Sequence, residues 1–282
     1  MNAILLDGYS LHSLTAVQPC QTKSATGLGF PEVRLDQYNR PGVSGVTIAH
    51  NLYGGRTITL EGTIRGADRT AYMANRAALE AAVSLRLDSV NVPIARTLYL
   101  FDLDFNAYQI SVVTKAFSCE LTTPTMGRWQ LQLAATDFII ESQTQSSVSL
   151  ALPLSGGVTY PVTYPVQYGS SSGGSVSASN LGNAAAFPLI SLYGPCINPV
   201  ISNDSTGESI RLNLILITGD VLTIDARRRV IVQGASTNRM GSLLQGSKFW
   251  AVLPGNNTIR LTADAYDAGY AIITFKSSYL GL

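Results

Sequence analysis

Apolar and polar residues alternate along several stretches of this chain, and this pattern limits the folds that the chain can adopt. In residues 57–65 it places Ile58, Leu60 and Ile64 on one face of a strand and charged residues on the other face. Residues 128–133 repeat the pattern, with the tryptophan and two leucines pointing inward. Further strands are predicted at residues 97–103, 108–115 and 117–121. The N-terminal half is therefore predicted to be mainly β.

One stretch, residues 68–87, is predicted to be helical. It opens with Asp68, a preferred N-cap residue, and is rich in Ala, Arg, Leu and Glu. Helical spacing puts Tyr72, Leu79 and Val83 on one stripe. We expect this single helix to pack on the sheet.

From residue 187 onward the pattern is β throughout. Short strands separated by turn signals are typical of a β-sandwich. Residues 218–220 are predicted to form a tight hairpin turn between strands at 209–217 and 221–225. Residues 253–257 are predicted to form a turn before a strand at 258–263. The other strands are predicted at residues 188–193, 199–203, 230–233 and 270–276.

The composition changes between these two halves. A Tyr-Pro-Val unit recurs after four residues from Tyr160 to Tyr164, and residues 169–174 contain only Ser and Gly. Proline removes donors from a β-ladder, so this segment is predicted to be extended or an edge strand. The chain is thus predicted to consist of three parts, an N-terminal β domain at residues 1–145, a junction at 146–182 and a C-terminal β-sandwich at 183–282.

Charge is scarce and balanced along the 282 residues. Charged residues make up 13% of the chain, about half of what an average soluble domain carries, and Lys+Arg number 19 against 18 for Asp+Glu. This balance argues against a disordered charged tail and against a surface that neutralises nucleic-acid phosphates. Low charge with many Gly and Tyr is typical of a β-rich protein that buries surface against copies of itself or partners.

Signals for disulfides and membrane insertion are missing. Cys20, Cys119 and Cys196 are widely spaced and form no CxxC pair, so we expect three reduced, mostly buried thiols. The N-terminus has no basic segment, and no window approaches about 18 continuous apolar residues. We expect synthesis and folding in a cytoplasm and no membrane anchor.

The chain also lacks a convincing catalytic or metal-binding motif. Its two histidines, His12 and His50, are far apart, and residues 102–106 imitate a calcium loop without its glycine and glutamate. A β-turn explains the latter stretch better. The GxSxG pattern at residues 169–173 is better explained by low complexity, and the basic run at 227–229 by a solvated hairpin tip. We expect no enzyme activity, no cofactor and no metal.

Three stretches together resemble one protein family. The first is Gly-Leu-Gly-Phe-Pro at 27–31 with Tyr-Asn-Arg-Pro-Gly at 38–42 and the loop and strand at 53–62. The second is the Tyr-Pro-Val-Thr-Tyr-Pro junction at 160–165. The third is the ordered series of turn motifs from Asn-Leu-Gly-Asn at 180–183 to Leu-Pro-Gly-Asn-Asn-Thr-Ile-Arg at 253–260. In this order they look like the distal tail proteins (Dit) and related minor tail proteins of siphophages, the long-tailed, non-contractile bacteriophages.

This resemblance implies a structural role at the virion tail tip. Family members form a ring, typically hexameric, from the N-terminal β-sandwich-like domain with its helix, and a C-terminal galectin-like or carbohydrate-binding-module-like sandwich projects outward. The ring joins the tail tube protein to the tail-tip hub and to fibre or receptor-binding proteins. Its lumen passes the tape-measure protein and then the DNA, without sequence-specific binding. Assembly is expected in the cytoplasm of the bacterial host.

The loop at residues 37–55 is a candidate for the contacts that a ring needs. We expect Tyr38, Arg40, Tyr53 and Arg56 to contribute contacts to other subunits or to the tube. The alternative is that these residues only pack within their own subunit.

Two other function classes remain open at the level of sequence. A carbohydrate-binding or receptor-adhesion role of the C-terminal sandwich would use exposed aromatic residues, with Trp250, Tyr266 and Tyr270 as candidates, and a buried Trp250 would count against it. A cell-wall hydrolase is the other class, and the paucity of histidines and convergent acidic motifs argues against it.

Overall fold

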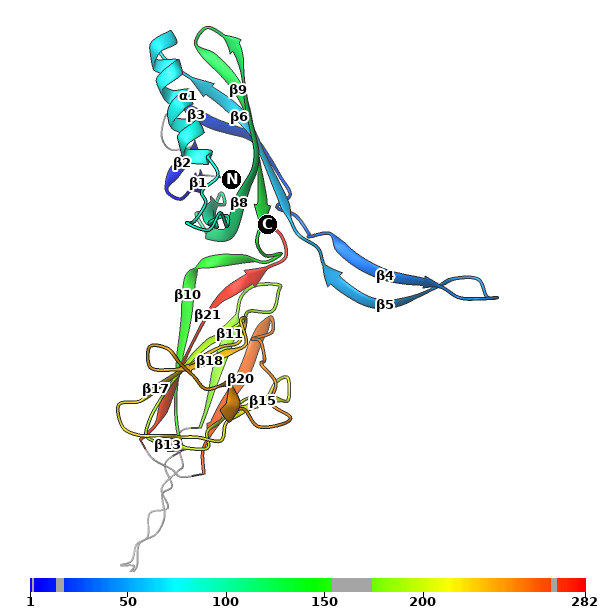
Figure 1. Ribbon diagram of the computed structural model, residues 1–282, viewed down its shortest axis with the longest axis vertical. Coiled ribbons are helices and arrows are strands. Elements are labelled where there is room, and N and C mark those ends of the chain that lie inside the picture. The colour runs from blue at the N-terminus through cyan, green and yellow to red at the C-terminus, as the bar shows by residue number, and fades with distance from the viewer. Residues whose placement is uncertain (2, 14–17, 154–173, 265–267) are drawn as a thin grey trace, which may run out of the picture. The chain divides into compact units, whose positions relative to one another are not determined.

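The protein forms two compact units that are built almost entirely from strands. The computed structural model describes residues 1, 3–13, 18–153, 174–264 and 268–282. One unit comprises Met1–Gln143 and Tyr279–Leu282, and the other comprises Thr144–Ser278. Among the described residues there is one α-helix, α1 (Arg69–Val83), beside a single 3-10 turn, η1 (Met240–Ser242). The prediction of a mainly β fold with one helix is confirmed (Figure 1).

These two units differ from the predicted domains at the predicted junction, residues 146–182. The second unit begins at Thr144 and includes strand segments on both sides of residues 154–173, namely most of β10 (Ile140–Ala151) and all of β11 (Ser175–Asn180). Residues 154–173, with Tyr160, Tyr164 and the GxSxG pattern, lie outside the described residues. Residues 279–282 belong to the first unit, and no change of composition in the sequence indicates this.

The N-terminal unit is built on one antiparallel sheet in the order β3-β6-β9-β8-β7-β1-β2. The bounds of these strands are β1 (Ala3–Leu6), β2 (Tyr9–Ser13), β3 (Cys20–Thr26), β6 (Thr57–Arg65), β7 (Arg96–Phe101), β8 (Ala107–Thr123) and β9 (Met126–Ala135). The predicted inward faces of residues 57–65 and 128–133 are buried. The two strands predicted at 108–115 and 117–121 are one strand, β8, because a bulge between Thr114 and Ala116 absorbs the break in alternation.

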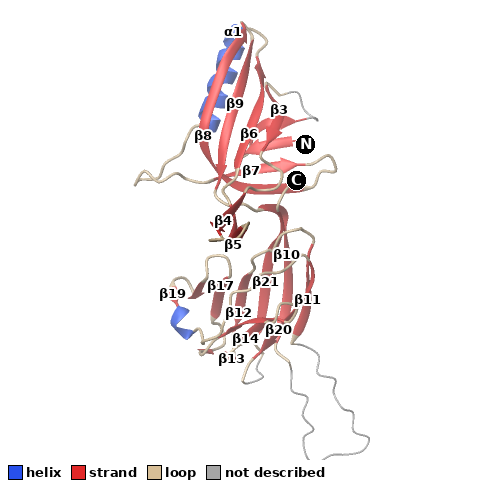
Figure 2. Ribbon diagram, turned by 90° about the vertical axis from the view of Figure 1, so that its right-hand side faces the viewer, coloured by secondary structure: helices blue, strands red, loops and turns tan. Residues whose placement is uncertain are grey.

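Helix α1 covers one face of this sheet, behind β8 and β9 in Figure 2. Its buried residues are Tyr72, Leu79 and Val83, the predicted stripe. The Asp68 carboxylate accepts a hydrogen bond from the Ala71 N–H at 2.7 Å, which makes Asp68 the N-cap. The helix ends at Val83, four residues before the predicted end, because Ser84 has an extended ψ of 145° and its hydroxyl donates to the Ala81 carbonyl at 2.9 Å.

The Asp68 cap predicts a modest and specific loss of stability. Asp68→Ala removes the acceptor for the Ala71 N–H and should lower the free energy of unfolding of the helix-bearing unit by about 1 kcal/mol. Urea unfolding followed by far-ultraviolet circular dichroism measures this loss. Asp68→Asn, which keeps an acceptor oxygen, is the control and should stay within a few tenths of a kcal/mol of the wild type. Equal losses in the two variants would contradict the capping role.

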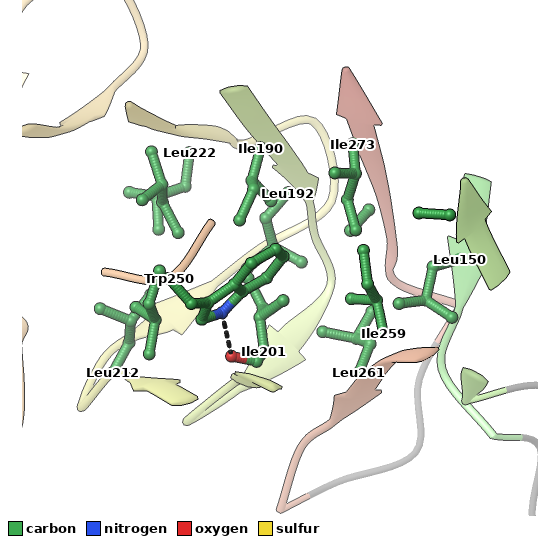
Figure 3. Close-up of a cluster of buried hydrophobic side chains, with 14 of the residues drawn as sticks. Leu150, Ile190, Leu192, Ile201, Leu212, Leu222, Trp250, Ile259, Leu261 and Ile273 are labelled. Carbon is green, nitrogen blue, oxygen red and sulfur yellow. Dashed lines mark hydrogen bonds between the residues drawn. The ribbon is translucent and has the colours of Figure 1, made fainter. Parts of the chain in front are cut away.

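The C-terminal unit contains two antiparallel sheets with a shared core. One has the order β19-β18-β17-β12-β21-β10, the other β11-β20-β14-β15, and β13 pairs with β16. The bounds are β12 (Leu189–Tyr193), β13 (Cys196–Ile197), β14 (Val200–Asn203), β15 (Glu208–Arg211), β16 (Ile215–Leu216), β17 (Val221–Asp225), β18 (Val230–Gln233), β19 (Thr237–Asn238), β20 (Gly255–Thr262) and β21 (Tyr270–Tyr279). Buried side chains from both sheets, such as Ile190 and Ile259, meet in one cluster (Figure 3).

The structure corrects the prediction of a hairpin around residues 218–220. The turn forms, because the Asp220 carboxylate accepts from the Ile217 N–H at 3.0 Å. Its flanking strands do not pair with each other: β16 pairs with β13, and β17 pairs with β12 and β18. The strand predicted at 209–217 is also divided, because the N–H groups of Leu212 and Asn213 bond to the carbonyls of Pro199 and Ser242 instead. Alternation shows which side of a strand is buried but does not identify its neighbour.

Candidate interaction surface

A two-stranded hairpin extends from the N-terminal unit and carries many exposed apolar side chains. It consists of β4 (Val33–Asn39) and β5 (Val46–Tyr53), which pair with each other in a sheet of their own. Every residue of both strands is exposed. In Figure 1 this β4–β5 hairpin leaves the sheet on the side away from α1. At about 3.3 Å per residue, seven residues of β4 extend about 23 Å.

The pairing register makes the hairpin amphipathic. Residues directly opposite each other share a face, and the register pairs Val33 with Tyr53, Gln37 with Ile48, and Asn39 with Val46. Leu35, which pairs with Asn51, lies between the first two of these pairs, so this face carries five apolar side chains and three amides. We call it the apolar face. The other face carries Arg34, Tyr38, Thr47 and Leu52. Ile48, in the half of the hairpin that is furthest from its root, is 51% exposed.

The root of the hairpin is fixed to the unit by aromatic packing and backbone bonds. The Tyr53 ring stacks on Phe138 with centroids 4.8 Å apart and meets Phe30 edge-on at 5.6 Å. The Gly54 N–H donates to the Glu32 carbonyl at 2.7 Å. The hairpin therefore leaves the unit from an ordered base.

Arg56 follows this root and is enclosed by the unit itself. Its side chain is buried, with the residue only 4% exposed, and its two Nη groups donate to four backbone carbonyls. These carbonyls belong to Gly27, Gly29, Phe138 and Leu280, at 3.1, 2.8, 2.9 and 2.6 Å. Burial lowers the pKa of the guanidinium, which nonetheless stays charged because arginine is not deprotonated in proteins near neutral pH. Arg56 ties four chain segments together.

The four contact residues predicted from the sequence thus have three different environments. Tyr38 and Arg40 are exposed on the hairpin, where the Arg40 Nε donates to the Thr47 hydroxyl at 3.1 Å. Tyr53 packs at the root, and Arg56 is a buried structural residue that is unavailable to another subunit. The apolar residues of the opposite face, Val46 and Ile48 above all, were missed. The apolar-polar-apolar pattern of residues 46–48 contained the signal.

Of the three aromatic residues proposed for glycan binding, the structure describes Trp250 and Tyr270, and it buries Trp250. Trp250 is 1% exposed, and its indole N–H donates to the Ile201 carbonyl at 3.1 Å inside the core (Figure 3). Tyr270 stacks on Tyr193 with centroids 4.6 Å and planes 7° apart, so each ring covers a face of the other. Tyr266 lies outside the described residues. A glycan platform needs exposed ring faces, and Trp250 and Tyr270 do not supply one together.

The described residues assemble no metal centre. No group of three or more His, Cys, Asp and Glu side chains that could hold a metal ion occurs among them. The Asp102 carboxylate accepts from the N–H groups of Asp104 and Asn106 at 2.9 and 2.8 Å, so the imitation of a calcium loop is a β-turn. Burial raises the pKa of the Cys20 thiol to about 12, which keeps it protonated and unreactive. In the part of the chain that is described, no helix has the length and apolar character that crossing a membrane requires.

Comparison with known proteins adds a family and a fold to this geometry. Residues 181–279 match the family described as the C-terminal domain of the siphovirus-type tail component. The crystal structure of the Dit protein of phage SPP1, described as a paradigm of the hub adsorption apparatus in phages that infect Gram-positive bacteria, superposes with a TM-score of 0.69. That match has 12% sequence identity and covers 98% of each chain.

Two structures of the phage P2 baseplate in its activated conformation, with Ca and with Sr, match more distantly. Their TM-scores are 0.46 and 0.44, with 9% and 10% identity, and they cover 90% and 96% of this chain and 89% and 96% of the chains they match. Comparison with curated proteins by sequence gives no match. Of these three structures, the SPP1 Dit protein is similar enough to establish the fold. Residues 181–279 are therefore similar to the C-terminal domain of the siphovirus-type tail component, and the chain has the fold of Dit, the distal tail protein family that its sequence resembles.

Proposed function

We propose that this chain is a structural protein of the distal tail of a siphophage and that copies of it join into a ring through the β4–β5 hairpin. The ring, hexameric if it follows the family, joins the tail tube protein to the tail-tip hub and to fibre or receptor-binding proteins. Its lumen passes the tape-measure protein and the DNA. The proposal is supported by the tail-component domain at residues 181–279 and by the Dit fold of the whole chain.

The observation that carries the proposal is the uncovered apolar face of the hairpin. An isolated two-stranded hairpin is marginally stable in water, and an exposed apolar strip on it favours association. Val46 and Ile48 lie towards the tip, beyond the root contacts of Tyr53. A second copy can cover them, and a contact between two different surfaces of identical subunits closes into a ring when its rotation closes.

A pair of neighbouring substitutions on β5 tests this proposal. Ile48→Asp places a charge on the apolar face and should weaken each subunit contact about a hundredfold or more, because a buried carboxylate without a partner costs several kcal/mol. Thr47→Asp, on the opposite face, is the matched control and should assemble like the wild type. Light scattering over a range of concentrations, with negative-stain imaging of the large species, measures assembly.

Two results would contradict the proposal. One is a wild-type protein that stays monomeric at every concentration, and the other is a ring that Ile48→Asp leaves intact.

A further inference from the structure

The connection between α1 and β7 displays a cluster of apolar side chains. We call residues 85–94 the apolar turn. Its five large apolar residues are all exposed, with Val90 the most open at 73%, and they are Leu85, Leu87, Val90, Val92 and Ile94. A monomer seldom exposes so many apolar side chains in ten residues without a use for them.

Backbone hydrogen bonds hold the apolar turn in one conformation. The Asp88 N–H donates to the Val92 carbonyl at 2.9 Å, and the Asp88 carboxylate accepts from the N–H groups of Val90 and Val92 at 2.9 and 2.8 Å. Asn91 has a φ of 62°, a left-handed conformation that asparagine tolerates. The Ile94 N–H donates to the Arg86 carbonyl at 2.9 Å and closes the base. The exposed side chains are therefore presented by a fixed backbone.

An ion pair between buried Arg96 and partly exposed Asp7 fixes the turn to the end of the helix. Arg96 donates from Nε to the Asp7 carboxylate at 2.8 Å and from Nη1 to the Ala82 carbonyl. Burial opposes ionisation of Asp7, but hydrogen bonds from Arg96 and the Thr97 N–H outweigh it and hold the pKa of Asp7 below its ordinary value. Arg86, inside the turn, lies 3.5 Å from the same carboxylate. Both ends of the apolar turn are thus anchored.

A second turn at the other end of β7 shows that this backbone does not require apolar residues. In residues 102–106 the Asp102 N–H donates to the Asn106 carbonyl. The Asp102 carboxylate accepts from the N–H groups two and four residues later, as the Asp88 carboxylate does. Phe105 there has a φ of 61°, like Asn91. The five equivalent residues of each turn carry two exposed apolar side chains, Val90 and Val92 in one and Leu103 and Phe105 in the twin turn. The three further apolar residues of the apolar turn, Leu85, Leu87 and Ile94, lie in its flanks, so its larger apolar surface does not come from the turn geometry.

The same chain contains a surface of matching chemistry that is also uncovered. The distal half of the β4–β5 hairpin exposes Val43, Val46 and Ile48. The hairpin leaves the sheet on the side away from α1 (Figure 1), whereas the apolar turn follows directly on α1. Within one chain neither surface is covered. In a head-to-tail assembly, a projecting element of one subunit meets a different surface of the next.

We propose that the apolar turn is the receptor for the distal half of the β4–β5 hairpin of a neighbouring copy. The inference rests on the proposed ring and names the surface on which the hairpin docks. Burial of the two apolar clusters against each other stabilises the contact. The anchoring by Asp7 and Arg96 lowers the entropy that binding would otherwise cost.

Crosslinking between two variants that each add one exposed cysteine tests the docking. Ile48→Cys is mixed with Val90→Cys, each with its own tag, and treated with a short bismaleimide. The matched control replaces Val90→Cys with Leu103→Cys, in the twin turn, where the leucine is 70% exposed. The two turns lie at opposite ends of the six residues of β7, about 20 Å apart. The wild-type chain, whose own three cysteines form no disulfide, shows the background.

We expect a crosslinked dimer that carries both tags from Ile48→Cys with Val90→Cys, and at least tenfold less of it with Leu103→Cys. Light scattering on each mixture reports assembly separately. Assembly with equal or no crosslinking at the two turns would overturn the docking and leave the ring standing. A failure of the wild type to assemble would instead overturn the proposed function.

Discussion

Replacing Arg56 with methionine is expected to destabilise the N-terminal unit by about 3 to 5 kcal/mol. The guanidinium of Arg56 satisfies four backbone carbonyls, two from residues 27–29, one from Phe138 and one from Leu280 near the end of the chain. Methionine has a similar length but donates no hydrogen bond, so it leaves these carbonyls unpaired in a place from which water is excluded. The loss includes the anchoring of the last residues to the first unit.

Arg40→Met is the matched control for this prediction. Arg40 is exposed and donates from Nε to one threonine hydroxyl, so the same substitution there should change stability by less than about 0.5 kcal/mol. Urea unfolding combined with hydrogen exchange of peptides from β6 and β9 locates the loss. If Arg56→Met instead assembled poorly with unchanged exchange, Arg56 would be a subunit contact, as the sequence first suggested.

Arg56 also shows where reading the sequence alone fails. An arginine in a glycine-rich loop after a tyrosine has the composition of a binding surface, and the sequence contains nothing that marks its acceptors. All four acceptors are backbone carbonyls, which every residue type has, so the residue types do not mark them. One of them lies 224 residues from Arg56 along the chain. Such a site depends on where chain segments meet in space, and periodicity does not encode that.

The positions of the helix and the strands were more predictable than the pairing of the strands. Asp68, the stripe of α1 and the buried faces of β6 and β9 follow from local spacing, and all of them are present in the structure. The early end of α1 at Val83 coincides with the extended backbone of Ser84, and Arg96 from beyond the turn donates to the freed Ala82 carbonyl, a partner that local spacing does not indicate. The apolar face of the hairpin is indicated in the sequence by the apolar-polar-apolar pattern of residues 46–48.

In the C-terminal unit, Trp250→Ala is expected to cost about 3 to 5 kcal/mol of stability. The indole fills the centre of the cluster between the two sheets, against residues such as Leu212 and Leu222 (Figure 3). Its removal leaves a cavity and also an Ile201 carbonyl without its donor. Trp250→Phe keeps most of the apolar volume and loses the hydrogen bond, so we expect a smaller loss of about 1 to 3 kcal/mol.

The order of three variants separates a core residue from a ligand-binding one. If Trp250 is structural, the loss of stability is smallest for Tyr270→Ala, larger for Trp250→Phe and largest for Trp250→Ala. The loss for Tyr270→Ala should be below about 1.5 kcal/mol, because Tyr270 contributes a half-exposed ring stacked on Tyr193. Hydrogen exchange of peptides from β14 and β20 measures these losses in the intact chain. A Trp250→Ala chain with wild-type protection and altered binding on a glycan array would reverse the assignment. The buried indole N–H argues for the first result, because a donor already paired with the Ile201 carbonyl has no hydrogen bond left to offer a sugar.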